Sequence, residues 1–596
     1  MGKSGQQEKR RGSRLFSATA SAALILSGAV HNVAAQVATP EVRAAEERAA
    51  QERLRRQEER IREQQYQLQP KADVLSPAAD AATATELPLE SPCFVLREIS
   101  LTGAGISRFS WLQEQTLPFL NRCIGVQGLS RIASVLDAKL IKLGYATTRV
   151  SLPQQNLQSG KLELVLHVGR IATVRMVKSG DPAAAAAADD NWGTWRNAFP
   201  GLPALGAGDI LNIRDLEQGV EQMKRLPSQT VATRIEPGVD ADTSNIVIER
   251  QSGTLQDRIR GGITVDNSGS ESLGRAQLAS YLAIDNPLGI NDILNLSANS
   301  NLSQPEANHR SQSLAFNYSL PFGYNTFTLS DSVSRFAQMV QATTARFLSS
   351  GSSETAEFKW HRTIVRTASA KFGLYAGVLN RRANSYLDDV ELVLSRRRTT
   401  SLEAGVTYKK LIAAGELDLD LGYRRGMPWF NAEDDMPQGG PTTRPQIWSL
   451  DLNYSQPFSI GPQPLQYNAS LHGQSSNDTL LAVDQIAIGS RYSVRGFDGN
   501  SVLLADSGFY LRNELAMPAK LIAGVDTQLY AGLDLGRVWG PNQVNLIGNK
   551  LAGAAIGVRG KWQALQLDAS LGTPLYQPAG FKTHHVNPYV ALTYGF

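Results

Sequence analysis

The chain has only two cysteines, no large excess of one charge and, beyond Ala35, no long apolar run. A helix that spans a membrane needs about 20 apolar residues in a row, so we expect no transmembrane helix after Ala35. Charged residues make up 19% of the chain, and the net charge is +4. Nucleic-acid binding needs a clustered basic face, so this composition argues against a nucleic-acid partner.

Residues that carry catalysis are also scarce. The 7 histidines are scattered, and His584 and His585 fall where a connection before the last strand is expected. No glycine–lysine loop for phosphate and no Ser-His-Asp set can be recognised. We therefore expect no enzyme, no catalytic residue, no cofactor and no metal site.

The cysteine pair is Cys93 and Cys123, both in one small predicted domain. No third or fourth metal ligand lies nearby in the sequence. An isolated pair in an oxidising compartment favours a disulfide, which is our prediction.

Residues 1–35 have the pattern of an export signal. A basic start is followed by the apolar stretch Leu15–Val30 and by the small residues Val33-Ala34-Ala35 before a cleavage point. A membrane anchor is the alternative, but the apolar part is short and rich in Ala and Ser. We expect the protein to be exported.

Residues 39–68 are predicted to form a polar helix. Seven Glu and seven Arg lie between Glu41 and Leu68, and the apolar seam is thin. At about 1.5 Å per residue this helix would be roughly 40 Å long. Two interpretations stay open: a solvated or weakly coiled helix in the periplasm, and a plug inside a wet pore. Residues 69–92 follow as a linker, because their prolines and their Ala-, Thr- and Asp-rich body cannot build a core.

Two small α/β units are predicted at 93–169 and 170–252. The first should contain, by its hydrophobic spacing, Phe94–Leu101 (strand), Ser110–Leu120 (helical), Leu129–Leu143 (amphipathic helix), Thr147–Leu152 and Lys161–His167 (strands). The second repeats this order with Ile171–Val177 (strand), Trp192–Phe199 (short helical piece), Ile213–Leu226 (helix), Thr230–Glu236 and Asn245–Arg250 (strands).

Residues 258–596 consist of short alternating segments separated by Gly, Asn and Asp. The last ten residues place Tyr594 and Phe596 on one face, as in the C-terminal signal of an outer-membrane barrel. A soluble sandwich would alternate too, but the export signal and the terminal aromatic residue favour a transmembrane antiparallel β-barrel. The length accepts 14, 16 or 18 strands of about 9–11 residues each.

One stretch of this region, 489–509, reads GSRYSVRGFDGNSVLLADSGF. It is too rich in glycine for a helix and too long for a tight turn. At its tip lie Val494, Arg495, Gly496 and Phe497. A solvated loop arginine is one interpretation, and a guanidinium held inside the structure by a carboxylate is the other.

The following strands offer two carboxylates for Arg495. Alternation places Asp534 on the inward face between two glycines, which leave room for a guanidinium. Glu514 also faces inward, but Arg512 shares its face and is expected to compete for it. We therefore rank Asp534 first and Glu514 second.

The two α/β units resemble polypeptide-transport-associated (POTRA) domains. The matching words are GYATTRVSLPQQNLQSGKLELVLHVGRI in the first unit and RDLEQGVEQMKRLPSQTVATRIEPG in the second. The barrel carries VDNSG at 265–269, DNPLGIND at 285–292, the tip at 494–497 and GLDLGRVWG at 532–540. With these words the chain resembles the transporters of two-partner secretion (TpsB), the haemolysin-activator and filamentous-haemagglutinin transporter family.

This resemblance implies sixteen barrel strands in the outer membrane of a Gram-negative bacterium, with periplasmic POTRA domains. It implies export of a large partner protein (an adhesin, a haemolysin or a contact-dependent toxin) that binds the POTRA domains in extended form, by strand addition. Barrel assembly machinery and outer-membrane lipid are the further partners it implies. An outer-membrane protein assembly factor (insertase) is the alternative, and two POTRA units plus the N-terminal helix favour secretion over it.

Overall fold

The computed structural model describes residues 73–75, 87–178, 205–271, 273–302, 309–341, 346–435, 440–541 and 546–596. The predicted export signal, the predicted polar helix 39–68 and the short helical piece 192–199 lie outside these residues. No helix in the described ranges is long and apolar enough to cross a membrane.

The first α/β unit has a three-stranded sheet in the order β2-β5-β4, with β1 and β3 paired separately. Its elements are β1 (Phe94–Val95), β2 (Glu98–Thr102), η1 (Ile106–Phe109), α2 (Trp111–Glu114), η2 (Leu117–Phe119), β3 (Cys123–Ile124), α3 (Val126–Lys142), β4 (Arg149–Ser151), η3 (Leu157–Ser159) and β5 (Lys161–His167). The core includes Ile132, Leu136 and Leu140 of α3, which are buried at helical spacing against alternate residues of β5.

Two predictions for this unit need correction. The predicted strand Phe94–Leu101 is two strands, because the chain changes partner at its middle: the Leu96 N–H donates to Arg122, whereas the Arg97 N–H donates to Gly160. The predicted helical segment 110–120 is one turn of α-helix flanked by 3-10 turns, and Pro118 stands in the second of them. Proline lacks the N–H that a continuous helix would need.

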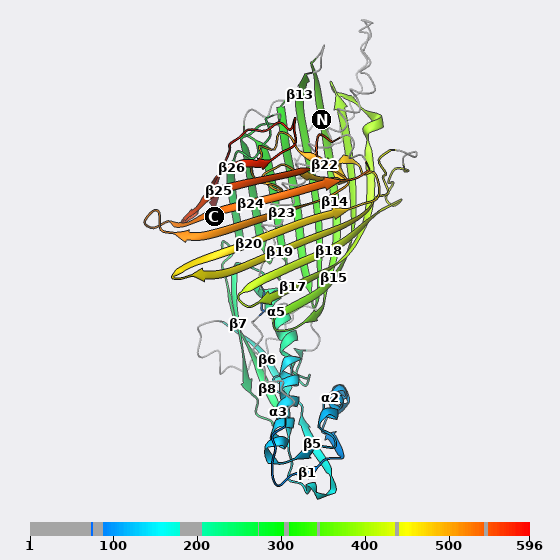
Figure 1. Ribbon diagram of the computed structural model, residues 1–596, viewed down its shortest axis with the longest axis vertical. Coiled ribbons are helices and arrows are strands. Elements are labelled where there is room, and N and C mark those ends of the chain that lie inside the picture. Colours follow the sequence, from blue (N-terminus) through cyan, green and yellow to red (C-terminus); the bar gives the residue numbers. More distant parts are fainter. Residues whose placement is uncertain are drawn as a thin grey trace, which may run out of the picture. The chain divides into compact units, whose positions relative to one another are not determined.

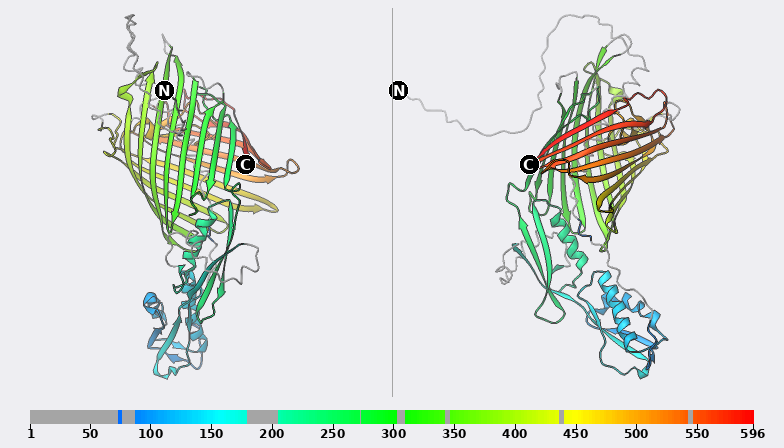
Figure 2. Two further views of the ribbon diagram at one scale, coloured as in Figure 1. Left: turned by 180° about the vertical axis from the view of Figure 1, so that it is seen from behind. Right: turned by 60° about the vertical axis from the view of Figure 1, so that its left-hand side comes forward.

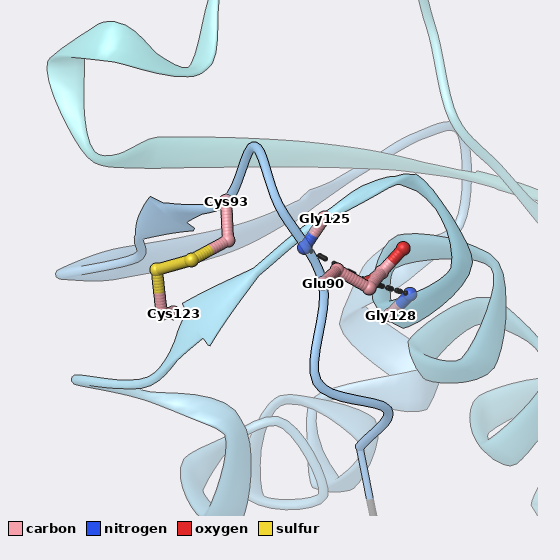
Figure 3. Close-up of a disulfide and its surroundings, with 5 residues drawn as sticks. All are labelled: Glu90, Cys93, Cys123, Gly125 and Gly128. Carbon is pink, nitrogen blue, oxygen red and sulfur yellow. Dashed lines mark hydrogen bonds between the residues drawn. A yellow bond between two sulfur atoms is a disulfide. The ribbon is translucent and has the colours of Figure 1, made fainter.

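Glu90 ties the chain before β1 to the start of α3, and the disulfide ties it to β3 (Figure 3). The Glu90 carboxylate accepts hydrogen bonds from the backbone N–H groups of Gly125 at 3.0 Å, Gln127 at 2.7 Å and Gly128 at 2.7 Å. These are donors that the start of a helix leaves without helical partners, and a negative charge there also suits the helix dipole. The predicted Cys93–Cys123 disulfide is confirmed.

The second α/β unit has the sheet order β6-β8-β7. Its elements are β6 (Arg170–Lys178), α5 (Ile213–Lys224), β7 (Gln229–Pro237) and β8 (Thr243–Ser252). Leu216, Val220 and Met223 of α5 pack onto the sheet, and the Asn212 side chain caps the helix by accepting from the Arg214 N–H at 2.8 Å.

The remaining strands, apart from β21 and β22 of a loop described below, close into one antiparallel barrel (Figures 1 and 2). Among the described residues sixteen strands go round it, because β15 pairs directly with β17 past the two-residue β16 (Val390–Glu391) and η6 (Val393–Ser395). They are β9 (Ile259–Asp266), β10 (Gln277–Asp285), β11 (Ile293–Asn301), β12 (His309–Phe322), β13 (Asn325–Gln341), β14 (Arg346–Arg366), β15 (Ala370–Leu387), β17 (Arg397–Ile412), β18 (Gly415–Met427), β19 (Gln446–Ile460), β20 (Gln463–Ser475), β23 (Ser507–Ala519), β24 (Asp526–Trp539), β25 (Lys550–Trp562), β26 (Leu565–Tyr576) and β27 (Asn587–Gly595). Green strands form one wall in the figures, and the yellow-to-red strands form the other.

The C-terminal residue takes part in closing the barrel between β27 and β9. The backbone groups of Phe596 and Gly261 exchange two hydrogen bonds, each of 2.9 Å. The Phe596 ring also lies over Gly261, where an added Cβ would come within 2.4 Å of it. Tyr594 and Phe596 both face outward and are exposed, as their alternation predicts.

The loop between β20 and β23 is longer than its predicted part. It runs over 476–506 and contains η7 (Ala482–Asp484), β21 (Ile486–Ile488) and β22 (Leu503–Ala505), which pair with each other. Residues 507–509, which the sequence analysis assigned to the loop, begin β23.

Candidate functional site

The structure places the tip of this loop against the inner wall of the barrel. The Arg495 guanidinium makes two hydrogen bonds to one carboxylate: Nε donates to Oδ2 of Asp534 at 2.7 Å, and Nη2 donates to Oδ1 at 2.8 Å. The Asp534 side chain has no exposed surface, and that of Arg495 is 10% exposed. This is the bidentate geometry that suits arginine and not lysine.

Glu514, the second-ranked carboxylate, also contacts Arg495. Nη1 of Arg495 donates to Oε2 of Glu514 at 2.6 Å. Glu514 is shared with Arg559 of β25, whose Nη2 donates to it at 3.0 Å, and Arg559 in turn lies 3.6 Å from Asp568 of β26. Three carboxylates and Arg559, on four neighbouring strands of the inner wall, together with Arg495 of the loop, form a set of linked ion pairs, which we call the lumen charge network.

Sequence reasoning did not identify Arg559. The sequence predicts that Arg512 competes for Glu514. One contact of Arg512 is a hydrogen bond from Nη1 to the Tyr492 carbonyl at 3.4 Å. The alternation of Gly557, Arg559 and Lys561 was a usable signal, because it puts Arg559 on the inward face. That signal could not tell which inward cation reaches Glu514, since this depends on strand register.

Glycines make the close approach of the loop possible. A Cβ on Gly532 would lie 2.3 Å from Nη2 of Arg495, and a Cβ on Gly553 would lie 1.8 Å from the Arg495 carbonyl oxygen. Gly496 has φ of +107°, and a Cβ there would lie 2.4 Å from the Thr573 carbonyl oxygen. A side chain at any of these three positions would push the loop away from the wall.

Val494 and Phe497 anchor the loop by apolar contacts. Both are buried, in a cluster with residues of β21, β22, β24 and β25 and with Phe581. The Phe497 and Phe581 rings meet edge to face at 5.6 Å. The four tip residues thus have different roles. Val494 and Phe497 bury apolar surface, Arg495 makes the ion pair, and Gly496 permits the turn.

A second polar contact joins the α/β unit that precedes the barrel to the barrel itself. The Arg366 side chain at the end of β14 is 1% exposed, and its Nη1 lies 2.7 Å from Oε2 of Glu221 on α5. Glu217, also on α5, lies 3.5 Å from Nε of Arg366. Gln218 donates to the Gly323 carbonyl in the β12–β13 turn at 3.3 Å.

Two titratable groups on the same unit show that burial in this contact removes water from charged side chains. Burial lowers the pKa of Arg225 to about 10, although the nearby charges of Asp292, Glu221 and Asp285 act in the opposite direction. Burial also raises the pKa of Asp215, although a hydrogen bond from the Tyr324 hydroxyl acts to lower it. Arg225 stays charged at neutral pH and donates to Oγ of Ser319 at 2.6 Å.

Asp73 lies at the same end of the barrel. Its carboxylate pairs with Nζ of Lys409 at 2.6 Å and with Nζ of Lys371. These lysines are direct cross-strand partners on β15 and β17, on the face that lines the lumen. Lys371 also pairs with Glu221 of α5 at 3.0 Å. Asp73, which precedes the first α/β unit in the sequence, is therefore held where the second unit meets the barrel.

A barrel of this size with an inward-folded loop, preceded by two small α/β units, is the architecture of an outer-membrane protein transporter. Family models match the chain at 94–169 (POTRA domain, ShlB-type), at 170–237 (POTRA domain) and at 242–560 (haemolysin secretion/activation protein ShlB/FhaC/HecB). The chain belongs to this last family.

Related proteins are similar to this chain over most of its length. The outer membrane transporter CdiB-2 of Burkholderia pseudomallei (strain 1026b) is 37% identical over 531 residues, which are 86% of this chain and 88% of the relative. The structure of CdiB from Escherichia coli superposes with a TM-score of 0.77 at 28% identity, covering 93% of this chain and 99% of that one. CdiB from Acinetobacter baumannii gives 0.79 at 26% identity, with 92% and 99% covered.

The protein is therefore a two-partner secretion transporter that exports a secreted partner protein. Its sixteen-strand barrel lies in the outer membrane, and its POTRA domains lie in the periplasm. The predicted fold class, location and function are confirmed, and the family is one of transporters, not enzymes. Because the chain belongs to the ShlB/FhaC/HecB family, secretion is favoured over the alternative function of outer-membrane protein assembly.

Proposed function

We propose that the secreted partner is received as an extended chain on a free edge of the POTRA sheets and then passes through the barrel. The observation that carries this proposal is strand β7 of the second POTRA domain. It is nine residues long, and within the described residues it pairs with β8 alone. An edge strand of this length offers a row of unpaired backbone groups to another chain.

The other edge of this sheet, β6, is equally long, but of its residues 170–177 only Thr173 is exposed. The edges of the other POTRA domain are shorter. In the first POTRA domain β4 has three residues and β2 has five. On β7, Thr233, Arg234 and Ile235 are exposed in succession, so both faces of the strand are open to a partner. The proposed cargo is an adhesin, a haemolysin or a contact-dependent toxin. The likeness to the CdiB transporters favours a cargo of the kind that CdiB exports.

Photo-crosslinking tests the edge. A photoreactive residue is placed in turn at Ala232, Thr233 and Arg234 of β7, and at Glu98 and Thr102 of β2 as controls, in cells that also express the partner. Strand addition predicts crosslinks from consecutive β7 positions, because an added strand runs alongside both faces. Crosslinks from every second residue only, or from β2 alone, would contradict it.

The predicted polar helix 39–68 is proposed to occupy the lumen at rest. Support comes from Asp73, which follows the segment closely and is held between two lumen-facing lysines. Deleting residues 36–69 should raise single-channel conductance in planar bilayers while the barrel stays folded. Unchanged conductance would place the segment in the periplasm. Asp73→Asn should raise the frequency of open events without changing the size of the open channel.

The remaining predicted partners belong to this proposal too. Tyr594 and Phe596 are proposed as the signal by which barrel assembly machinery recognises the chain, and outer-membrane lipid surrounds the apolar outer face. The tip 494–497 is proposed to hold the loop during export. No nucleic-acid partner is proposed.

A further inference from the structure

The outer face of β15, β17 and β18 changes character along the strands, which lie side by side (Figure 1). The part of this face nearer the periplasm is apolar, with direct cross-strand pairs such as Val378–Leu402 and Val406–Leu421. Further from the periplasm, the pair Asn380–Thr400 is polar. The apolar belt therefore ends at this row.

A group of cations lies where the apolar belt ends, and we call it the arginine patch. Arg382 on β15 and Arg398 on β17 lie beyond this row, and Arg425 on β18 lies in the row of Val378 and Leu402. Arg382 and Arg398 are direct cross-strand partners, and Arg425 is paired with Leu402. All three are exposed, and in the described part of the chain none of the three guanidinium groups has a hydrogen-bond or ion-pair partner. Like charges placed directly opposite each other repel, so the pair favours an anion between them.

The surrounding charges leave the patch positive. Glu354 of β14 is the exposed residue opposite Arg382 on its other side. The Glu354 carboxylate offsets the charge of one of the three arginines. The patch as a whole therefore keeps a net positive charge.

The patch lies at the depth of a membrane interface. From Phe372 near the periplasmic end of β15 to Arg382 the strand climbs about 26 Å, at about 3.4 Å per residue and a tilt of about 40°. An outer-membrane barrel has an apolar band about 25 Å tall. The periplasmic end is the one where Arg366, just before β15, meets the POTRA domain, so the patch faces the outer leaflet.

Exposed aromatic residues mark the same interface. Trp429 and Phe430 are 40% and 67% exposed, and the Trp429 carbonyl accepts from Oγ1 of Thr400 at 2.8 Å, which places this turn beside the patch. Trp448, 54% exposed, packs on Tyr423 at 4.8 Å between centroids. Aromatic girdles of this kind sit at the level of lipid headgroups.

A hollow at the edge of the patch combines both chemistries. Its lining includes Arg425 and Arg444 together with Leu402, Met427 and Pro428. Arg444 supports the hollow from within, since its guanidinium donates to the backbone carbonyls of Met427 and Glu433. Such a hollow fits an amphiphile with an anionic head and a hydrocarbon chain.

We propose that the arginine patch binds the phosphorylated headgroup of the outer-leaflet lipid, lipid A, with a phosphate between Arg382 and Arg398 and a second near Arg425. Guanidinium groups bind phosphate through two parallel hydrogen bonds, and such an ion relieves the repulsion of the opposed pair. The hollow then takes part of an acyl chain.

Native mass spectrometry of the full-length protein in detergent tests this site. Diphosphoryl lipid A is titrated against the native protein, the triple variant Arg382→Gln, Arg398→Gln, Arg425→Gln, and the control Lys410→Gln. Lys410 is an exposed, outward-facing cation at the periplasmic end of β17. Heat-modifiable migration in SDS gels shows that each barrel is folded.

The triple variant should bind lipid A at least tenfold more weakly, and Lys410→Gln should bind it normally. Monophosphoryl lipid A should bind the native protein more weakly than the diphosphoryl form. Equal binding by the native and triple variants, or an equal loss in Lys410→Gln, would overturn the site. Binding of inorganic phosphate or phosphatidylglycerol as tightly as lipid A would overturn its assignment to the outer-leaflet lipid.

Discussion

The backbone N–H of Arg495 donates to Oδ2 of Asp534 at 2.9 Å, the oxygen that also accepts from Nε of the same residue. One buried carboxylate therefore fixes both the main chain and the side chain of the loop tip. Removing one partner of a buried pair leaves the other uncompensated, at a cost of about 3–5 kcal/mol. That cost falls on loop position, because the hydrogen bonds of the barrel ladder remain.

Exchanging the charges of this pair is the direct test. Arg495→Asp and Asp534→Arg alone should each reduce release of the partner protein into the medium at least tenfold, while heat-modifiable migration stays normal. The double swap should restore part of the release. The control Arg537→Asp, on the outward face of β24, should secrete normally. Normal secretion by either single variant would show that the pair is dispensable.

Gly532→Ala should resemble loss of Arg495, although it changes no charge. The new methyl group would occupy space 2.3 Å from Nη2 of Arg495, so the guanidinium must leave Asp534. Gly560→Ala is a matched control, because a Cβ there meets its nearest atom, on Val525, at 3.6 Å. We expect at least a fivefold loss of secretion for Gly532→Ala and none for Gly560→Ala. Equal secretion by the two variants would contradict the tight fit.

Glu90→Ala should loosen the start of α3. Loss of a capping group costs about 1 kcal/mol, which is about a fivefold increase in local opening. Hydrogen exchange by mass spectrometry should report this at Gly125, Gln127 and Gly128, the three donors to the Glu90 carboxylate. Glu114→Ala removes an exposed acid of the same domain and should leave α3 unchanged. Unaltered protection of α3 in Glu90→Ala would mean that other contacts hold the helix.

Arg366→Ala should free the second POTRA domain from the barrel. It removes the cation that Glu217 and Glu221 share, in a contact where Arg366 is 1% exposed. Spin labels on β7 and on a periplasmic turn of the barrel should show a broader distance distribution by pulsed electron paramagnetic resonance. A pair exchange, Arg366→Glu with Glu221→Arg, should narrow it again. A distribution that stays narrow in Arg366→Ala would show that the hydrogen bonds of Gln218 and Arg225 suffice.

Several features could be predicted from the sequence because they depend on local period. Spacing of three and four residues placed α3 correctly, because a helix buries one stripe. Alternation put Asp534 and Glu514 inside and Tyr594 outside, because successive side chains of a strand point to opposite faces. The cysteine pair was readable because no other cysteine competes for either partner. The strand number came from family resemblance alone, since the length of the region allows several.

Which of these residues meet depends on how the strands pair and where the loop lies. Alternation says that Arg512 and Arg559 both face inward, but the register of β23, β24 and β25 and the fold of the loop bring Arg559 to Glu514. Asp73 reads as part of a polar linker, and its partners Lys371 and Lys409 lie hundreds of residues away on two strands. The opposition of Arg382 and Arg398 likewise exists only through the pairing of β15 with β17. Side-chain period is a local property of the chain, whereas register and loop position depend on contacts between distant segments.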